Sequence, residues 1–335
     1  MVYPNHIDAS GIWKLKNLHS DIADGTFPEA TEGNRGIFGG GSGPITNVID
    51  YIEISSLGNA ADFGDLAVAC NGAEGISSKV RTLFTGGYEP GVQYSTRMQY
   101  ITPQTQGNTT DFGDITESGY GAGCNNDTRG VIHIGNAYPG DSSSEVMEYI
   151  TFASTGDASD FGDLTGDGRY ASVGFGDGKR GVFAGGRTPG QSPSEQDDID
   201  FIYIASTGDS VDFGNLASVN HYHAGCSSKI TGIIMAGGNN LGETMKLNLL
   251  SKGDAVDFND LAVIKAAPGA VATATRAIAA GGTNPSDAVH NVIEYHDIVT
   301  GGDFVDFGNL TVARYMYGCC GATNNNAGLS DTARA

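Results

Sequence analysis

Acidic residues are the side chains in this sequence whose type and spacing point most directly to chemistry. The phrase Asp-Phe-Gly-Asp, or a close variant, occurs six times, with its first aspartate at Asp62, Asp111, Asp160, Asp212, Asp257 and Asp306. Paired carboxylates supply the oxygen ligands that a hard cation such as Ca²⁺ prefers, so calcium binding is one interpretation. Against it, the spacing lacks an EF-hand loop, and Asn215 and Asn309 replace the second acid in two copies.

The second interpretation of the phrase is structural. Its phenylalanine is then the large apolar residue that packs between repeated units, and its aspartates flank a tight turn and accept hydrogen bonds from backbone N–H groups. The repeat anchors predicted in this way are Phe63, Phe112, Phe161, Phe213, Phe258 and Phe307. We favour this interpretation, which predicts no bound cofactor or metal and leaves Ca²⁺ as the alternative.

The remaining polar residues form no catalytic pattern. Asp-Phe-Gly occurs five times without a partner lysine strand or a catalytic loop, which argues against a protein kinase. His221 and His223 could share one face of a strand and bind a metal, but no third ligand is identifiable. The five cysteines are an odd number without a Cys-x-x-Cys pair, which argues against a disulfide framework or a zinc site. We therefore expect a protein that is not an enzyme.

The phrase returns at a nearly constant spacing. The steps between its copies are 49, 49, 52, 45 and 49 residues, and a period of about 50 is typical of a stacked or closed repeat fold. Eleven residues before each copy lies Lys246 or an aromatic residue, within segments whose alternation predicts a half-buried strand. The aromatic residues at this position are Tyr51, Tyr100, Tyr149, Phe201 and Tyr295.

Two further strands complete each unit. An apolar strand that ends in two glycines, such as "RGIFGG" at 35–40, precedes the aromatic strand, and a glycine-rich strand follows each anchor. The first unit has no preceding glycine-rich strand, whereas the last such strand, at about 311–322, has no unit after it. We therefore expect this last strand to pair with the strand that begins at Arg35 and to close six four-stranded units without an open edge.

The four-stranded unit resembles the kelch repeat in its double glycine and in the aromatic residue of the next strand. The resemblance covers residues 35 to about 325 and implies a six-bladed kelch-like β-propeller, with the six anchor phenylalanines in place of the usual kelch tryptophan. The predicted organisation is an N-terminal arm at 1–34, a propeller at 35–325 and a C-terminal tail at 326–335.

The segments after the double glycines vary most in length. From the second glycine to the aromatic position they span 8 residues in one unit and 15 in another, and the longest lies within "GGRTPGQSPSEQDDIDF" at 185–201. Variation confined to one class of loops on a rigid scaffold is typical of a binding surface. The longest loop is polar and acidic, which suits a neutral or cationic partner, or a glycan.

The N-terminal arm carries the second resemblance. Trp13, Leu15 and Leu18 are spaced for a short amphipathic helix that would anchor a partner. The segment is similar to a short N-terminal sequence of tailed-phage structural proteins, which has the form Ser-Gly-x-Trp-x-Leu, a helix, then Gly-x-Trp-Pro. The matching residues are Ser10, Gly11, Trp13, Leu15, Gly25 and Pro28, and Phe27 departs from the pattern.

This second resemblance implies a virion component of the tail, a tail fibre or the capsid surface. Its partners would be other virion proteins through residues 1–34 and a host-surface glycan or protein through the variable loops. The alternatives are a glycan-active enzyme with a site at the propeller centre and a cytoplasmic protein-interaction scaffold.

Charge and hydropathy narrow the classes of partner. The net charge is −21, with only 18 basic residues and no run of them, which argues against a nucleic-acid surface. The N-terminus has no apolar core of signal-peptide length, and no stretch approaches about 18 apolar residues. We expect synthesis in the host cytoplasm, incorporation into the virion and no membrane insertion.

Overall fold

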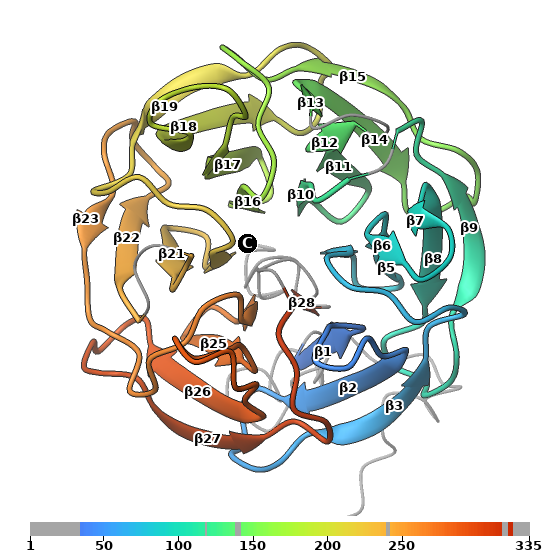
Figure 1. Ribbon diagram of the computed structural model, residues 1–335, viewed down its shortest axis with the longest axis vertical. Coiled ribbons are helices and arrows are strands. Elements are labelled where there is room, and N and C mark those ends of the chain that lie inside the picture. Colours follow the sequence, from blue (N-terminus) through green and yellow to red (C-terminus); the bar gives the residue numbers. More distant parts are fainter. Residues whose placement is uncertain (1–33, 118, 138–141, 239–241, 317–320, 324–335) are drawn as a thin grey trace, which may run out of the picture. The chain divides into compact units, whose positions relative to one another are not determined.

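The computed structural model describes residues 34–117, 119–137, 142–238, 242–316 and 321–323. These residues form six antiparallel four-stranded sheets, arranged around an axis as the blades of a six-bladed β-propeller (Figure 1). The predicted fold class is confirmed. The predicted anchor residues of the arm, Trp13, Leu15 and Leu18, lie outside the described residues.

Each blade places its strands from the axis outward in the same order (Figure 1). Blade 1 comprises β28 (Gly321–Thr323), β1 (Arg35–Gly39), β2 (Val48–Glu53) and β3 (Ala61–Asp65); blade 2 comprises β4 (Glu74–Ser77), β5 (Thr82–Thr85), β8 (Arg97–Ile101) and β9 (Thr110–Asp114). Blade 3 comprises β10 (Ala122–Asn125), β11 (Arg129–His133), β14 (Val146–Thr151) and β15 (Ser159–Asp163); blade 4 comprises β16 (Val173–Gly176), β17 (Arg180–Arg187), β18 (Glu195–Tyr203) and β19 (Val211–Asn215). Blade 5 comprises β20 (Ala224–Ser227), β21 (Thr231–Met235), β22 (Thr244–Asn248) and β23 (Val256–Asp257); blade 6 comprises β24 (Gly269–Ala272), β25 (Arg276–Ala280), β26 (Val292–Asp297) and β27 (Val305–Asn309).

Side-chain size follows distance from the axis. The innermost strands converge, so they are built from small residues: a Cβ on Gly174 would stand 2.2 Å from the carbonyl oxygen of Gly123 in the neighbouring blade. The second strand of each blade is almost wholly buried, as in β5, where all four residues are. The third strand is buried near its centre and more exposed toward its end, as in β2, where Ile49 and Asp50 are buried and Glu53 is exposed. The burial of the inner strands fixes the blades in place, and the loops lie at the two ends of these strands.

The ring closes as predicted. Strand β28 pairs antiparallel with β1, with Gly36 opposite Thr323 and Phe38 opposite Gly321. The C-terminal strand thus supplies the innermost strand of the blade that the first strand begins. It occupies the end of the predicted 311–322 segment, because Tyr315 belongs to the linker that bridges to Ser42.

The acidic phrase lies on the outermost strands, not at a tight turn as predicted. These strands run along the circumference (Figure 1), so the end of each one meets the start of the next. Gly107 donates its N–H to the carbonyl of Phe63 at 2.8 Å, and Thr109 donates to the carbonyl of Asp65 at 2.9 Å. In return, Asp65 donates its N–H to the Asn108 side chain at 3.0 Å. We call this set of bonds the rim interlock.

The rim interlock recurs at five of the six blade junctions. The glycine of each participating phrase has a φ between +137° and +152°, and a Cβ on Gly162 would stand 2.6 Å from the backbone of Gly208. Glycine is therefore needed both for the left-handed backbone and for the approach of the next blade. In blade 5, Asn259 takes this position, and β23 is only two residues long.

Replacing an interlock glycine should destabilise the propeller. Gly162→Ala is expected to cost about 2–3 kcal/mol in free energy of unfolding, because it combines an unfavourable φ with a steric clash. The matched control is Asn259→Gly, which places glycine where the phrase lacks it and should cost less than about 1 kcal/mol. Urea unfolding of both variants measures the difference, and equal costs would contradict the interlock.

Closure by β28 is tested by truncation. Deleting residues 321–335 should expose the edge of β1 and give aggregated protein, because an unpaired strand offers its N–H and C=O groups to other chains. Deleting only residues 326–335 leaves β28 in place and should give soluble protein. Size-exclusion chromatography separates the two outcomes. A soluble monomer with unchanged melting after the longer deletion would show that closure does not depend on β28.

Candidate functional site

The propeller has two different faces. Because adjacent strands are antiparallel, Glu74 at the start of β4 lies opposite Thr85 at the end of β5. The loops after the double glycines therefore share one face with the links between blades, which we call the loop face. The opposite face carries the tight turns, such as Ser78–Arg81, and we call it the turn face.

The loops of the loop face differ between blades. Blade 2 carries a hairpin of β6 (Tyr88–Glu89) and β7 (Gln93–Tyr94), and blade 3 carries one of β12 (Asn136–Ala137) and β13 (Ser142–Ser143). In blade 4 the main strands themselves extend, so β17 reaches Arg187 and β18 begins at Glu195. The regular scaffold thus presents unequal structures on this face.

A polar cavity of about 240 Å³ lies beside the extended loop of blade 4. Three of its residues, Arg169, Thr188 and Asp200, are more than nine-tenths buried, and the Arg169–Asp200 pair forms its floor. Its lining is Thr165, Gly166, Asp167, Arg169, Thr188, Gln191, Gln196, Asp198, Asp200 and Asp212. We call it the blade 4 pocket; none of its side chains is aliphatic or aromatic.

The floor of the blade 4 pocket is a buried ion pair. Arg169 Nη2 lies 2.6 Å from Asp200 Oδ2 and also donates to the carbonyl of Phe183 at 3.3 Å. Asp198 lies farther out, 4.0 Å from Nη1, and is largely exposed. The Nε of Arg169 is buried without a hydrogen-bond partner in the described part of the chain. Burial raises the pKa of the Asp200 carboxyl, and the Arg169 guanidinium partly offsets that rise. The pocket therefore presents several acceptors beside a buried guanidinium whose Nε has almost no accessible surface.

The Arg169–Asp200 pair belongs to a recurring scaffold element. In blade 1, Asp50 pairs with Arg314 at 3.1 Å, and in blade 6, Glu294 pairs with Lys265 at 2.7 Å. In each case the acid precedes the aromatic position of the third strand and the cation comes from the preceding linker, so the pair clamps the linker to the blade. Sequence reasoning missed these pairs. The available signal was a lone basic residue seven or eight positions after an anchor phenylalanine.

Half-buried tyrosines gather where the linkers reach the axis. Tyr94 and Tyr120 meet edge to face at 5.4 Å between ring centroids, and Tyr222 contacts both Tyr120 and Tyr170 at about 6.5 Å. Tyr222 has a φ of 53°, which is unusual for a bulky residue and marks a constrained backbone. Tyr170 directly follows Arg169 along the chain, but none of these tyrosines lines the blade 4 pocket.

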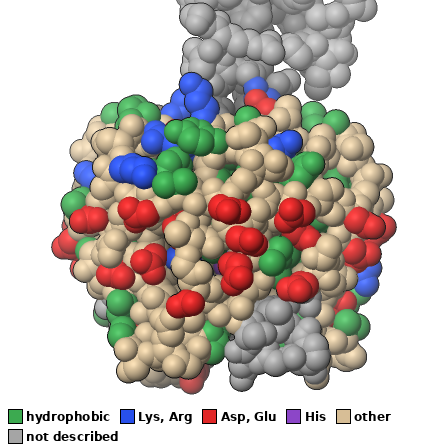
Figure 2. Space-filling view, turned by 90° about the horizontal axis from the view of Figure 1, so that it is seen from above, with side chains coloured by type: hydrophobic (Ala, Val, Ile, Leu, Met, Phe, Trp, Pro, Cys, Tyr) green, Lys and Arg blue, Asp and Glu red, His purple; other side chains and the backbone are tan. Residues whose placement is uncertain are grey.

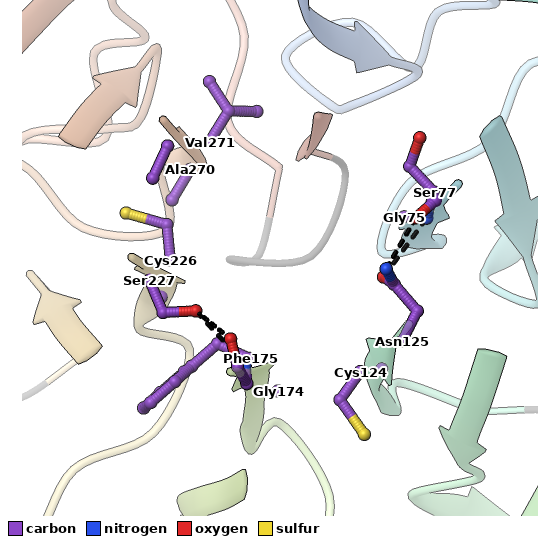
Figure 3. A pocket seen from close by; sticks show the side chains of 14 residues that line it. Gly75, Ser77, Cys124, Asn125, Gly174, Phe175, Cys226, Ser227, Ala270 and Val271 are labelled. Carbon is purple, nitrogen blue, oxygen red and sulfur yellow. Dashed lines mark hydrogen bonds between the residues drawn. The ribbon is translucent and has the colours of Figure 1, made fainter. Parts of the chain in front are cut away.

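A second, smaller cavity of about 50 Å³ lies on the axis between the innermost strands (Figure 3). It has room for about one or two waters. Ser227 donates to the Gly176 carbonyl at 2.7 Å across adjacent blades. Burial raises the pKa of the Cys226 thiol to about 12, and it raises that of Cys124 further, so both sulfurs stay protonated and are poor nucleophiles.

The predicted repeat anchors form columns between blades. Phe63, Phe112, Phe161, Phe213 and Phe307 are buried, and Phe258 is half-buried. Five pairs of rings meet edge to face at 5.7–6.2 Å: Tyr51–Phe63, Tyr100–Phe112, Tyr149–Phe161, Phe201–Phe213 and Tyr295–Phe307. An arginine lies over the tyrosine in four blades; Arg81, for example, stacks on Tyr100 and donates to the carbonyl of Phe152 in the next blade. These residues hold blades together.

The residues considered for metal binding do not come together. His221 is half-buried in a linker, whereas His223 is fully buried and bonds through Nε2 to the carbonyl oxygen of Ala184 at 3.0 Å. The first aspartates of the repeated phrase are exposed along the rim. Among the residues that the structure describes, no three His, Cys, Asp or Glu side chains are placed to hold one metal ion.

Comparison with models of known families and with curated proteins finds no match to this chain. Within the described ranges, no helix has the length and apolar character needed to cross a membrane. The functional argument therefore rests on the geometry of the two faces.

Breaking the floor of the blade 4 pocket should be costly. Arg169→Met leaves the Asp200 carboxylate buried without its partner, and such a loss costs about 3–5 kcal/mol in free energy of unfolding. The control is Arg187→Met, which removes a longer and more exposed ion pair to Glu195 and should cost about 1 kcal/mol or less. Urea unfolding of both variants measures the costs. Equal values would show that the buried pair does not stabilise the blade.

Acid should destabilise the propeller through its buried histidines. Burial lowers the pKa of His133 to about 3 and that of His223 to about 4. Below the unfolded value of about 6.5 the unfolded chain binds protons that the native chain excludes, so stability is lost as the pH falls from 6.5 toward 4. The loss is about 1.4 kcal/mol per pH unit for each histidine. His223→Gln should reduce the drop between pH 7 and pH 5, measured by urea unfolding, and an unchanged drop would contradict this assignment.

Proposed function

We propose that the protein is a non-enzymatic structural and adhesion module of a phage virion, in the tail, a tail fibre or the capsid surface. Residues 1–34 anchor it to other virion proteins, and the loop face binds a host-surface or virion partner. The observation that carries the proposal is the blade 4 pocket, a concave polar site built from the longest variable loop. The similarity of residues 10–28 to an N-terminal sequence of phage structural proteins supports the virion setting.

The turn face supports the attachment role. Asn34 lies there, because its carbonyl accepts the N–H of Ile54, and so the described part of the chain begins at this face. Large exposed apolar residues at its turns and strand ends are Leu57, Val80, Tyr203, Ile230, Leu250 and Val299. Apolar residues mixed with arginine and tyrosine are typical of protein interfaces.

The turn face differs in charge from the rest of the propeller. Its basic residues are Arg35, Lys79, Arg81, Arg129, Lys179, Arg180, Lys229, Lys252 and Arg276, and the acids at the same turns, connections and strand ends are Glu53, Asp127, Asp157, Asp177, Asp209, Asp254, Asp297 and Asp303. Figure 2 views the disc from its side. Lysines, arginines and hydrophobic side chains gather there toward one face of the disc, next to a band of acids. The charges of the turn face nearly balance, so this face carries far less negative charge than the rest of a chain of net charge −21.

Removal of the arm should separate folding from attachment. Deletion of residues 1–28, or Trp13→Ala, should leave the propeller folded but abolish its incorporation into particles, because a tryptophan anchor buries a large area. Mass spectrometry of purified particles and thermal melting of the purified protein measure the two outcomes. Particles that lack the wild-type protein would refute the virion role and favour the intracellular scaffold.

The turn face has a matched test. Val80→Asp/Ile230→Asp adds two charges to the turn face, whereas Val92→Asp/Ile264→Asp adds the same charges at comparably exposed sites on the loop face. Only the first pair should lower incorporation into particles. Equal loss in both pairs would contradict attachment through the turn face.

A further inference from the structure

We propose that the junction between blades 5 and 6 is an acid-sensitive seam, at which protonation of His296 opens the outer edge of the ring in mild acid. We call this junction the 5–6 seam; it comprises Phe258–Asp260 of blade 5 with His296 and Gly302–Phe304 of blade 6. The device goes beyond the proposed function and depends on neither the virion setting nor the partner of either face.

The 5–6 seam lacks the rim interlock that holds the other five junctions. The N–H groups of Gly302 and Phe304 do not bond to the carbonyls of Phe258 and Asp260, although the equivalent groups do so elsewhere in the ring. One side-chain bond takes their place, from Asn259 Nδ2 to the Gly302 carbonyl at 2.6 Å. Since blades 5 and 6 are neighbours in the ring (Figure 1), the backbone holds their shared outer edge less firmly than the other edges.

Two side chains at the seam depart from the repeat. His296 follows the aromatic position of the third strand, where the other blades have the aliphatic residues Ile52, Ile101, Ile150, Ile202 and Leu247. Phe304 lies two residues before the repeated phrase, where the other blades have the smaller residues Ala60, Thr109, Ala158, Ser210 and Ala255. Packing of two unusual rings therefore replaces the missing backbone bonds.

The packing of His296 suits only the neutral ring. The imidazole is buried; it stacks on Phe304 with 5.2 Å between ring centroids and meets Phe258 edge to face at 4.8 Å. Neither ring nitrogen has a hydrogen bond of normal geometry within the described residues. An imidazolium would carry two N–H donors and a charge into this apolar contact, which is costly without acceptors or water. The closed seam therefore excludes the second proton.

The charged groups around His296 do not reverse this preference. Burial lowers the pKa of His296, and the Lys246 ammonium across the junction adds to the lowering. The Gly302 backbone and the carboxylates of Asp297 and Asp303 oppose it in part. In an open seam the ring meets water and its pKa returns toward about 6.5, so the open state binds a proton that the closed state excludes. The open state therefore gains as the pH falls through about 6.5.

Opening is confined to the rim. The inner strands of both blades, β20, β21, β24 and β25, are buried and fully paired, so they keep the two blades in the ring. Release of the outer edge exposes the rings of Phe258 and Phe304 on a rim that is otherwise acidic. Mild acid thus reveals an apolar surface that neutral pH conceals.

The test is amide hydrogen exchange of the purified full-length protein, followed by mass spectrometry at pH 7 and pH 5.5 and corrected for the intrinsic pH dependence of exchange. The reporters are peptides that contain Phe258, whose N–H bonds to the Thr244 carbonyl at 2.9 Å, and Gly301, whose N–H bonds to the Asp297 carbonyl at 3.0 Å. The opening equilibrium at these amides should rise about four- to eightfold at the lower pH. Equivalent peptides at the other five junctions should change less than about twofold.

His296→Leu separates titration from packing. It places at the seam the residue that blade 5 carries as Leu247, so the variant should fold, and it should remove the rise between pH 7 and pH 5.5. Loss of packing alone would change opening equally at both pH values. The matched control is His223→Gln, which removes a buried histidine that bonds to Ala184 in blade 4 and should keep the rise at the seam.

A rise that persists in His296→Leu, an equal rise at all six junctions, or no rise in the wild-type protein would each overturn the proposal. None of these results depends on whether the protein is incorporated into particles.

Discussion

The rim interlock is the interaction on which the rest of the propeller depends. A four-stranded blade leaves its outer strand with one unpaired edge, and six such edges would be six sites for aggregation. Gly107 and Thr109 donate to the carbonyls of Phe63 and Asp65, and equivalent bonds at four further junctions likewise extend the outer edge into the next blade. The same bonds set the spacing between blades, so the anchor phenylalanines and the linkers have only one way to pack. The positions of the loop-face residues follow from this spacing.

Blade 5 shows how much of the repeat the ring can lose. It has Thr231 where the other blades have an arginine, Lys246 in place of the aromatic residue and Asn259 in place of the interlock glycine. Partial substitutes exist: Lys246 Nζ lies 4.9 Å over the Phe258 ring, and Asn259 Nδ2 donates to the Gly302 carbonyl at 2.6 Å. A closed ring can tolerate one weak junction because the neighbouring junctions still fix both blades.

Repetition explains which features the sequence could predict. Six copies of one phrase predict six blades, and the unmatched strands at the two ends predict closure. The location of the phrase on a strand could not be predicted, because the groups that bond to it lie in the next blade; Asp65 and Asn108 are 43 residues apart. The blade 4 pocket was hidden for a related reason. Asp200 looks like any polar residue in an alternating strand until Arg169, from the preceding linker, is placed against it.

The aspartates of the repeated phrase lie along the rim of the propeller, between the loop face and the turn face. Both aspartate and asparagine occur at the end of the phrase, so the rim interlock does not require a negative charge at this position. The charge instead places a negative belt around the edge of the disc, as Figure 2 shows, and like charges keep neighbouring discs from associating edge to edge. Association is then favoured only through the faces. The turn face gathers basic and apolar residues at its turns, whereas the loop face is polar and shaped by unequal loops, so the two faces differ in chemistry.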